Sequence, residues 1–274
     1  MKTLYVSDLD GTLLCSNATL SDETRDTINR LIDQGMLFTF ATARGHLTSA
    51  AVTQGLHLRL PKIIHNGALI ADPATGEVLR SNFFGSDAID LLNDLLSNGI
   101  HPIVYSFIDG VQRLSYVKDR CSPGVQRFAD ERKADLRMRP VNDAQALYLP
   151  DTFYFTCIDA PEKLAPLYEK YRDIHHAVFA RDIYSGDHWL EIMPKAASKA
   201  NACLQLKELL GCDRLVVFGD HTNDVDMFQI ADESCAMENA VEQLKSIATR
   251  VIGKNDDDGV VKWLRTNFER SERA

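Results

Sequence analysis

The chain has 274 residues, of which 45% are hydrophobic and 25% are charged. This composition is typical of a globular protein and excludes a disordered or fibrous one. The formal net charge of -9 disfavours nucleic acid and anionic membranes as partners, because both require a basic footprint. An anionic small molecule is not excluded, since a metal ion and one or two local cations can reverse the field inside a cleft.

We expect a cytoplasmic protein without a membrane segment. No apolar stretch approaches the ~20 residues of a membrane span, and residues 1–6 lack the length and the cleavage site of a signal peptide. The six cysteines show neither a CxxC pair nor a repeated spacing, which argues against a zinc site and a disulfide framework. Reduced thiols in a cytoplasmic compartment are the simplest interpretation.

The first part of the chain alternates apolar runs with helical patterns. A helix is expected to begin at Ser21 and to end at Gly35, and a second helix is expected to end by Gly55. Strands are expected at residues 4–6, 37–41, 63–64, 68–70 and 78–79. Short strands separated by helices predict βαβ units and a parallel sheet.

Residues 83–187 show a different pattern, in which hairpins are mixed with helices. The turn Asp109-Gly110 separates two of the expected strands. Helices are expected at residues 86–97 and 161–171, and strands at residues 103–107, 114–116, 153–157 and 177–179. This mixture predicts a separate α+β domain with an antiparallel sheet.

From Leu190 onwards the alternation of strands and helices resumes. A helix at residues 198–211 is expected to precede the strongly apolar strand at 215–218, and the remaining elements are expected at residues 225–230, 235–237, 251–252 and 260–264. The predicted fold class is therefore α/β. Its core is a doubly wound, Rossmann-like parallel sheet formed by residues 1–82 and 188–274, with residues 83–187 inserted as an α+β domain.

Chemically unusual side chains follow the expected core strands, at the sheet edge where open α/β sheets bind ligands. They are Asp8 and Asp10 after the first strand, Thr42 after the second, Asp220, Asn223 and Asp224 after the strand at 215–218, and Lys199 in the helix before it. Crowded carboxylates repel one another, so a cation is needed to hold them together. Oxygen ligands without histidine or cysteine select a hard ion, and Mg²⁺ fits. A carboxylate nucleophile, a metal ion and a lysine form a complete set for phosphoryl transfer.

Four segments resemble the motifs of the haloacid dehalogenase-like superfamily. Asp8-Leu9-Asp10-Gly11-Thr12 is similar to its DxDGT nucleophile motif, and Gly219-Asp220-His221-Thr222-Asn223-Asp224 is similar to its GDxxND motif. Thr42 and Lys199 occupy the positions of the second and third motifs. The Asn66-Gly67-Ala68 turn and the large insertion resemble the Cof-type branch with a C2 cap. The resemblance covers essentially the whole chain, with the motifs in order.

The resemblance implies a Mg²⁺-dependent phosphatase acting on a small phosphorylated metabolite. Asp8 would attack phosphorus and carry an aspartyl-phosphate, while Asp10 would protonate the leaving oxygen and then activate water. Mg²⁺ would be held by the Asp8 carboxylate, the backbone carbonyl of Asp10 and Asp220. Asp224 would orient Lys199 or a metal-bound water.

The resemblance also implies how the phosphate group is held. Its oxygens would be bound by the side chains of Thr42, Lys199 and Asn223 and by the backbone at Leu9 and Ala43. His221 departs from the family's pattern, because many relatives carry glycine there. It removes no ligand, and we expect it to narrow the mouth of the pocket.

Two alternative functions fit parts of this pattern. A sugar phosphomutase would use the same Asp8 and Asp10 chemistry but return the phosphate to the sugar. A non-catalytic phosphate-binding regulatory protein would keep the fold without turnover, and the intact set of Asp8, Asp10, Lys199 and Asp220 disfavours it. The substrate is left open, with sugar phosphates and pyridoxal phosphate as candidates, and so is the oligomeric state. We expect the inserted domain to close as a lid, which favours small substrates over phosphoproteins.

Overall fold

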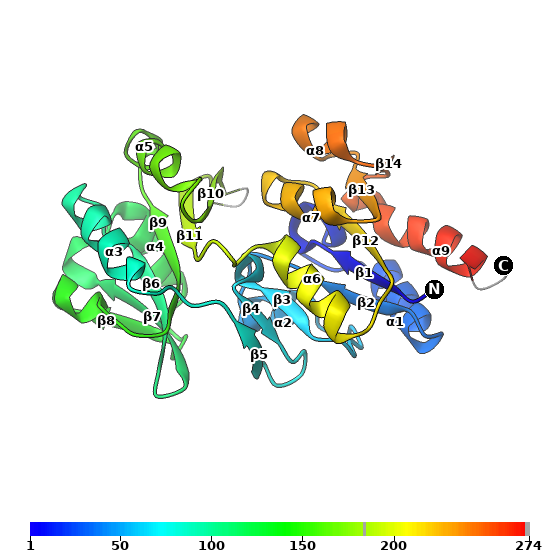
Figure 1. Ribbon diagram of the computed structural model, residues 1–274, viewed down its shortest axis with the longest axis horizontal. Coiled ribbons are helices and arrows are strands. Elements are labelled where there is room, and N and C mark those ends of the chain that lie inside the picture. The colour runs from blue at the N-terminus through cyan, green and yellow to red at the C-terminus, as the bar shows by residue number, and fades with distance from the viewer. Residues whose placement is uncertain (183–184, 272–274) are drawn as a thin grey trace. The chain divides into compact units, whose positions relative to one another are not determined.

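The computed structural model describes residues 1–182 and 185–271, and the chain is divided into two units. The first unit comprises Met1–Ser81 and Ala197–Ala274, and the second comprises Asn82–Ala196. The first unit contains two β-sheets and the second contains one (Figure 1).

A five-stranded parallel sheet with the order β14-β13-β12-β1-β2 forms the centre of the first unit. Its strands are β1 (Thr3–Ser7), β2 (Leu37–Phe40), β12 (Arg214–Gly219), β13 (Glu233–Met237) and β14 (Arg250–Ile252). The first strand of the chain lies in the middle, where Ser7 pairs with Phe40 on one side and with Phe218 on the other. Strands in a parallel sheet are covered on both faces, which explains the continuous apolar runs of β1 and β12.

Helices and a small antiparallel sheet complete the first unit. The helices are α1 (Asp22–Asp33), α2 (His46–Val52), α6 (Lys199–Leu209), α7 (Val225–Ile230), α8 (Glu242–Ile247) and α9 (Gly259–Ser271). The small sheet contains β3 (Lys62–Ile64), β4 (Leu69–Ala71) and β5 (Val78–Ser81). Helix α1 begins where the sequence indicates, because the Ser21 side chain accepts a hydrogen bond from the backbone N of Thr24.

A six-stranded sheet with the order β10-β11-β9-β6-β7-β8 forms the second unit. Its strands are β6 (Ile103–Ile108), β7 (Val111–Val117), β8 (Met138–Val141), β9 (Thr152–Ile158), β10 (His176–Arg181) and β11 (His188–Met193), and its helices are α3 (Asp87–Ser97), α4 (Pro123–Glu131) and α5 (Pro161–Tyr171). All neighbouring strands are antiparallel except β7 and β8. Helices α3 and α5 contribute Leu92, Leu95 and Leu164 to one apolar core with the sheet residues Val104 and Phe155.

The second unit ends later in the chain than the sequence indicates. The expected boundary lies at residue 187, whereas this unit continues to Ala196. The reason is β11, which pairs with β9 and β10 and therefore belongs to the six-stranded sheet. Sequence patterns show that a strand is present but not which strands it pairs with.

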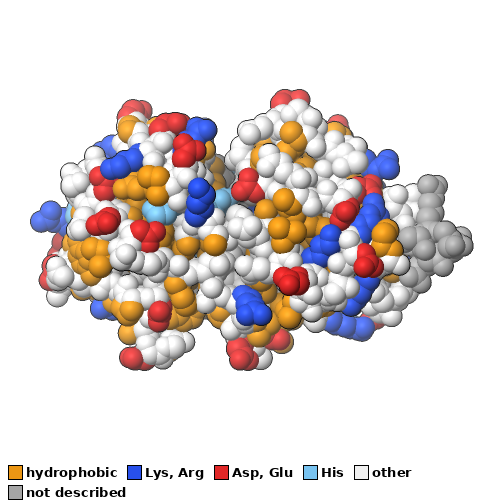
Figure 2. All heavy atoms as spheres, in the orientation of Figure 1, with side chains coloured by type: hydrophobic (Ala, Val, Ile, Leu, Met, Phe, Trp, Pro, Cys, Tyr) orange, Lys and Arg blue, Asp and Glu red, His pale blue; other side chains and the backbone are white. Residues whose placement is uncertain are grey.

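The prediction of an α/β fold with a central parallel sheet and an additional α+β domain is confirmed. Acidic and basic side chains are interspersed on the face of the molecule shown in Figure 2. Within the described ranges, none of the helices combines the length and the apolar character needed to cross a membrane.

Candidate active site

The predicted site residues of the first unit meet at the carboxyl edge of the parallel sheet. Asp8 follows β1, Thr42 follows β2 and Asp220 follows β12. The backbone N of Asp8 donates to the carbonyl of Phe218 at 2.9 Å, so the sheet hydrogen bonding continues as far as this carboxylate. Because β1 lies between β2 and β12, all three side chains start from neighbouring positions.

Lys199 bridges two of the carboxylates. Its Nζ lies 2.7 Å from Asp8 Oδ1 and 2.7 Å from Asp224 Oδ1, and its side chain is fully buried. Lys199 is placed by the start of helix α6, which Ser198 caps by accepting a hydrogen bond from the backbone N of Asn201. Burial alone would lower the pKa of Lys199, but the charges and hydrogen bonds of Asp224 and Asp8 outweigh burial and raise it.

Asp220 is held beside this pair by Thr12, whose Oγ1 donates to Asp220 Oδ1 at 2.9 Å. Burial, strengthened by the charge of Asp224, raises the pKa of Asp220 from its ordinary value of 3.8 to about 7. Burial also raises the pKa of Asp8. The positive charge of Lys199 lowers this pKa in part, whereas the negative charges of Asp224 and Asp220 raise it further. When all three are deprotonated, Asp8, Asp220 and Asp224 carry more negative charge than the single lysine neutralises.

The three carboxylates are close enough to share a metal ion. Asp8, Asp220 and Asp224 each offer one oxygen, and these oxygens all lie within 4.8 Å of one another. The donors are all oxygens and the carboxylates outnumber the lysine, which fits a small hard cation such as Mg²⁺. Asp224 is already engaged, because its Oδ1 accepts from Lys199 and its Oδ2 accepts from the backbone N of Asp220 at 2.9 Å and of His221 at 3.2 Å. The arrangement therefore favours Asp8 and Asp220 as side-chain ligands, with Asp224 fixing their surroundings.

Gly11 leaves the space that Asp220 occupies. Its φ of +74° lies in the left-handed region, and a Cβ at this position would lie 2.2 Å from Asp220 Oδ2. The glycine of the first motif is thus required both by the backbone conformation and by the Asp220 carboxylate beside it.

Asp10 makes a two-point ion pair that the sequence does not reveal. Arg44 donates through Nε to Asp10 Oδ2 at 2.7 Å and through Nη2 to Asp10 Oδ1 at 2.5 Å. The Asp10 carboxylate is not among the three whose oxygens lie within 4.8 Å of one another. The backbone N of Arg44 donates to Thr42 Oγ1 at 3.1 Å, so this arginine links the first and second motifs.

Asn223 also has a partner that the sequence does not reveal. Its Nδ2 donates to Oδ1 of Asn66 at 3.1 Å, and Asn66 is fully buried in the turn between β3 and β4. His221 is partly buried, and burial lowers the pKa of its ring. The asparagine of an Asn-Gly turn is ordinarily interpreted as turn chemistry, so the sequence offers no signal for its contact with Asn223.

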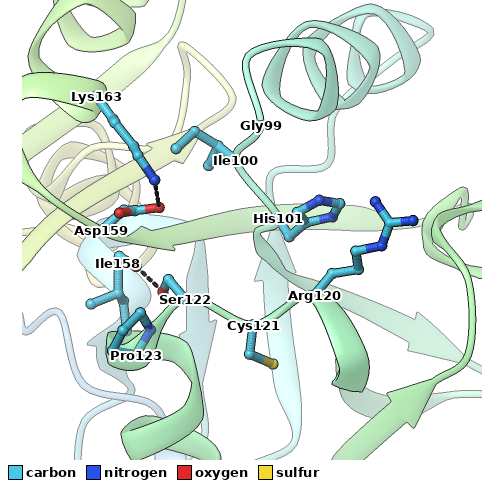
Figure 3. Close-up of a pocket in the computed structure, with 10 residues that line it drawn as sticks. All are labelled: Gly99, Ile100, His101, Arg120, Cys121, Ser122, Pro123, Ile158, Asp159 and Lys163. Carbon is cyan, nitrogen blue, oxygen red and sulfur yellow. Dashed lines mark hydrogen bonds and ion pairs between the residues drawn. The ribbon is translucent and has the colours of Figure 1, made fainter.

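The second unit contains a separate cavity of about 260 Å³, shown in Figure 3. Arg120, His101 and Lys163 line it, and Lys163 forms an ion pair with Asp159 at 3.1 Å. All of the lining residues belong to the second unit, and none is a predicted site residue. The cavity and the candidate active site are therefore different features of the chain.

Comparison with known proteins identifies a family and relatives that are similar to this chain over nearly its whole length. The family described as haloacid dehalogenase-like hydrolase matches residues 5–264. The chain is 28% identical over 97% of both sequences to 5-amino-6-(5-phospho-D-ribitylamino)uracil phosphatase YitU from Bacillus subtilis. A second Bacillus subtilis protein with the same activity in its name, YwtE, is 27% identical, with 96% of this chain and 97% of that one covered.

Solved structures show the same fold. TM0651 from Thermotoga maritima superposes with a TM-score of 0.75 at 28% identity, covering 97% of both chains. A haloacid dehalogenase-like hydrolase from Bacteroides thetaiotaomicron superposes with a TM-score of 0.76 at 25% identity, covering 97% of this chain and 99% of that one. Both matches include the inserted unit as well as the parallel-sheet unit.

Proposed function

The chain belongs to the haloacid dehalogenase-like hydrolases, as its motifs predicted, and we propose that it is a Mg²⁺-dependent phosphatase of a small phosphorylated metabolite with Asp8 as its nucleophile. That the chain is an enzyme of the phosphatase class follows from the family and from the relatives that share its full length. What we propose in addition is the metal ion, the roles of the individual residues and the substrate.

The observation that carries it is the buried bridge from Lys199 to Asp8 and Asp224. Lys199 donates to Oδ1 of Asp8, which leaves Oδ2 as the candidate attacking atom. An attack on phosphorus by this oxygen produces an aspartyl-phosphate and releases the alcohol of the substrate. Lys199 then faces the negative charge of the transferred phosphoryl group, while Asp224 keeps the ammonium group in place.

The metal ion would be held by Asp8, Asp220 and the backbone carbonyl of Asp10. When bound, Mg²⁺ neutralises phosphate charge and lowers the repulsion between the phosphate group and the attacking carboxylate. The raised pKa of Asp220 supports this assignment, because a carboxylate that is buried and lies beside another carboxylate gains most from a bound cation.

Asp10 is proposed to move the proton. It would protonate the leaving oxygen in the first step and take a proton from the hydrolytic water in the second. Its carboxylate is held at two points by Arg44, which limits the positions from which it can act. The remaining phosphate oxygens would be bound by the side chains of Thr42 and Asn223 and by the backbone N–H groups of Leu9 and Ala43.

We further propose that the substrate is a phosphomonoester on a sugar or sugar-alcohol chain. The support is the name of two relatives, which describes a phosphorylated ribityl compound. We expect the second unit, Asn82–Ala196, to act as the cap that selects the substrate. Its sheet would present the selecting residues, whereas the first unit supplies the chemistry.

A substrate panel tests the proposal. The purified chain is assayed with Mg²⁺ for release of inorganic phosphate from phosphorylated ribityl compounds, sugar phosphates, pyridoxal phosphate, phosphopeptides and a phosphoprotein. We expect the highest kcat/KM for one of the small phosphomonoesters. A higher kcat/KM for the phosphoprotein would contradict the substrate class, and isomer formation without phosphate release would identify a mutase instead.

A further inference from the structure

The turn between β3 and β4 has an unusual backbone. His65, Asn66 and Gly67 have φ values of +51°, +51° and +92°, so three successive residues are left-handed and two of them are not glycine. His65 is 4% exposed and Asn66 is 0% exposed. Such a conformation costs free energy and persists only where the surroundings hold it. A strained, buried turn next to a catalytic centre calls for a functional explanation.

The backbone of this turn joins two of the phosphate-binding segments. The N–H of His65 donates to the carbonyl of Arg44 at 3.0 Å, and the N–H of Asn66 donates to the carbonyl of Thr42 at 2.9 Å. On the other side, Gly67 lies directly against the residue before Lys199, because a Cβ at Gly67 would lie 2.1 Å from the carbonyl oxygen of Ser198. The turn is thus fixed between the second and third motifs.

The side chain of Asn66 extends this connection to the fourth motif. Its Oδ1 accepts a hydrogen bond from Nδ2 of Asn223 at 3.1 Å. An asparagine amide has a donor end and an acceptor end, and the partner decides which end faces which way. With Asn66 Oδ1 as the acceptor, one N–H of Asn223 is used and the second N–H on the same nitrogen remains able to donate to a ligand.

We propose that Asn66 is a positioning residue that orients the Asn223 amide so that it presents an N–H donor to the phosphate group. This inference rests on the proposed function, in which Asn223 binds a phosphate oxygen. Phosphate oxygens only accept hydrogen bonds, so an Asn223 amide turned by half a rotation would present its own oxygen and repel the substrate. The left-handed turn is what brings the Asn66 amide to Asn223.

The test separates the side chain of Asn66 from its backbone. Asn66→Gly removes the amide while tolerating a φ of +51°, so it deletes the hydrogen bond without adding backbone strain. Asp109→Gly is the matched control, because Asp109 has a φ of +50° and lies exposed in the second unit. Both variants, Asn223→Ala and the double variant Asn66→Gly/Asn223→Ala are assayed for kcat/KM and for competitive inhibition by inorganic phosphate.

If Asn66 acts through Asn223, Asn66→Gly lowers kcat/KM and weakens phosphate inhibition by about tenfold. Adding it to Asn223→Ala then changes kcat/KM by less than about twofold, since the residue that it positions is already gone. Full activity of Asn66→Gly, or a loss that multiplies with that of Asn223→Ala, would overturn the inference. We expect Asp109→Gly to behave as the wild type.

A second measurement needs no variant at Asn66. In the wild-type protein, one Nδ2 proton of Asn223, assigned by its disappearance in Asn223→Ala, should exchange slowly with solvent because it is bonded to Asn66. Rapid exchange of both protons would also overturn the inference. Phosphate release by the wild type and not by Asp8→Asn upholds the proposed function independently, so failure of the inference and failure of the function remain distinguishable.

Discussion

Lys199 Nζ lies 2.7 Å from Asp8 Oδ1, although 191 positions separate the two residues in the sequence. The contact exists because β1 and β12 are neighbours in the sheet and helix α6 leads into β12. It brings the only ammonium group of the candidate site, among the described residues, to the carboxylate proposed to attack phosphorus.

Replacing Asp8 with asparagine should abolish turnover while preserving the fold. An amide neither attacks phosphorus nor carries a phosphoryl group, and Lys199 keeps its second partner, Asp224. We expect kcat to fall by at least about 10³-fold, the scale of removing one member of a catalytic unit. Phosphate release measures the loss, and a thermal melt checks the fold. Near wild-type turnover by a pure sample would refute Asp8 as the nucleophile.

Replacing Lys199 with methionine should destabilise the metal-free protein strongly. It leaves the buried carboxylates of Asp8 and Asp224 without their cation, which costs about 3 to 5 kcal/mol in the free energy of unfolding. Lys207→Met is the matched control in the same helix, because its ion pair with Asp232 is partly exposed and should contribute less than about 1 kcal/mol. Denaturant unfolding with a chelator at pH 8 measures both variants, and equal losses would contradict the prediction.

The stability of the metal-free protein should depend on pH through Asp220. Because the pKa of Asp220 is raised from 3.8 to about 7 in the folded state, the folded protein binds more protons than the unfolded chain between these values. The resulting contribution of Asp220 to the free energy of unfolding is fully present below pH 3.8 and is lost as the pH rises through about 7. Denaturant unfolding at a series of pH values measures it.

Mg²⁺ should reverse this loss, because it binds the deprotonated carboxylates, and its stabilising effect should grow with pH. Asp220→Asn should reduce both the pH dependence and the response to Mg²⁺. Equal pH slopes for the wild type and Asp220→Asn would be inconsistent with the assignment. Turnover should cease with a chelator and return on addition of Mg²⁺.

Gly67→Ala should destabilise the fold more than Gly35→Ala does. Both glycines are left-handed, with φ values of +92° and +100°, so alanine at either position costs about 1 to 2 kcal/mol of backbone strain. A Cβ at Gly35 would meet nothing within 4 Å, whereas a Cβ at Gly67 would collide with the backbone of Ser198. We expect a further loss of about 1 to 3 kcal/mol at Gly67. Similar midpoints of denaturant unfolding for the two variants would show that the close approach is unimportant.

Much of this architecture can be predicted from the chain itself. Apolar runs such as residues 215–218 identify buried strands, and reactive side chains placed directly after them identify the carboxyl edge of a parallel sheet. That reasoning anticipates the proximity of Asp8 and Asp220, which follow neighbouring strands of the sheet, and of Lys199, which begins the helix that leads into β12.

Other features depend on tertiary pairing that no local pattern encodes. Strand β8 contains Pro140, which argues against a strand, but β8 lies at the edge of its sheet, where a missing N–H donor is tolerated. Arg44 appears as one more polar residue after β2, and only the folded chain brings its guanidinium to Asp10. Contacts of this kind join segments whose separation along the sequence follows no regular pattern.

The central position of β1 has a consequence for synthesis of the chain. One side of β1 pairs with β2, which is synthesised shortly afterwards. Its other side pairs with β12, so Ser7 has no partner on that side until Phe218 has been synthesised. At about 5 to 20 residues per second, a ribosome supplies that partner on the order of 10 to 40 s later. Until then β1 has an open edge that can pair with other chains, and Asp8 lacks its lysine. The nascent chain therefore has an exposed strand edge during the same interval in which its candidate active site is incomplete.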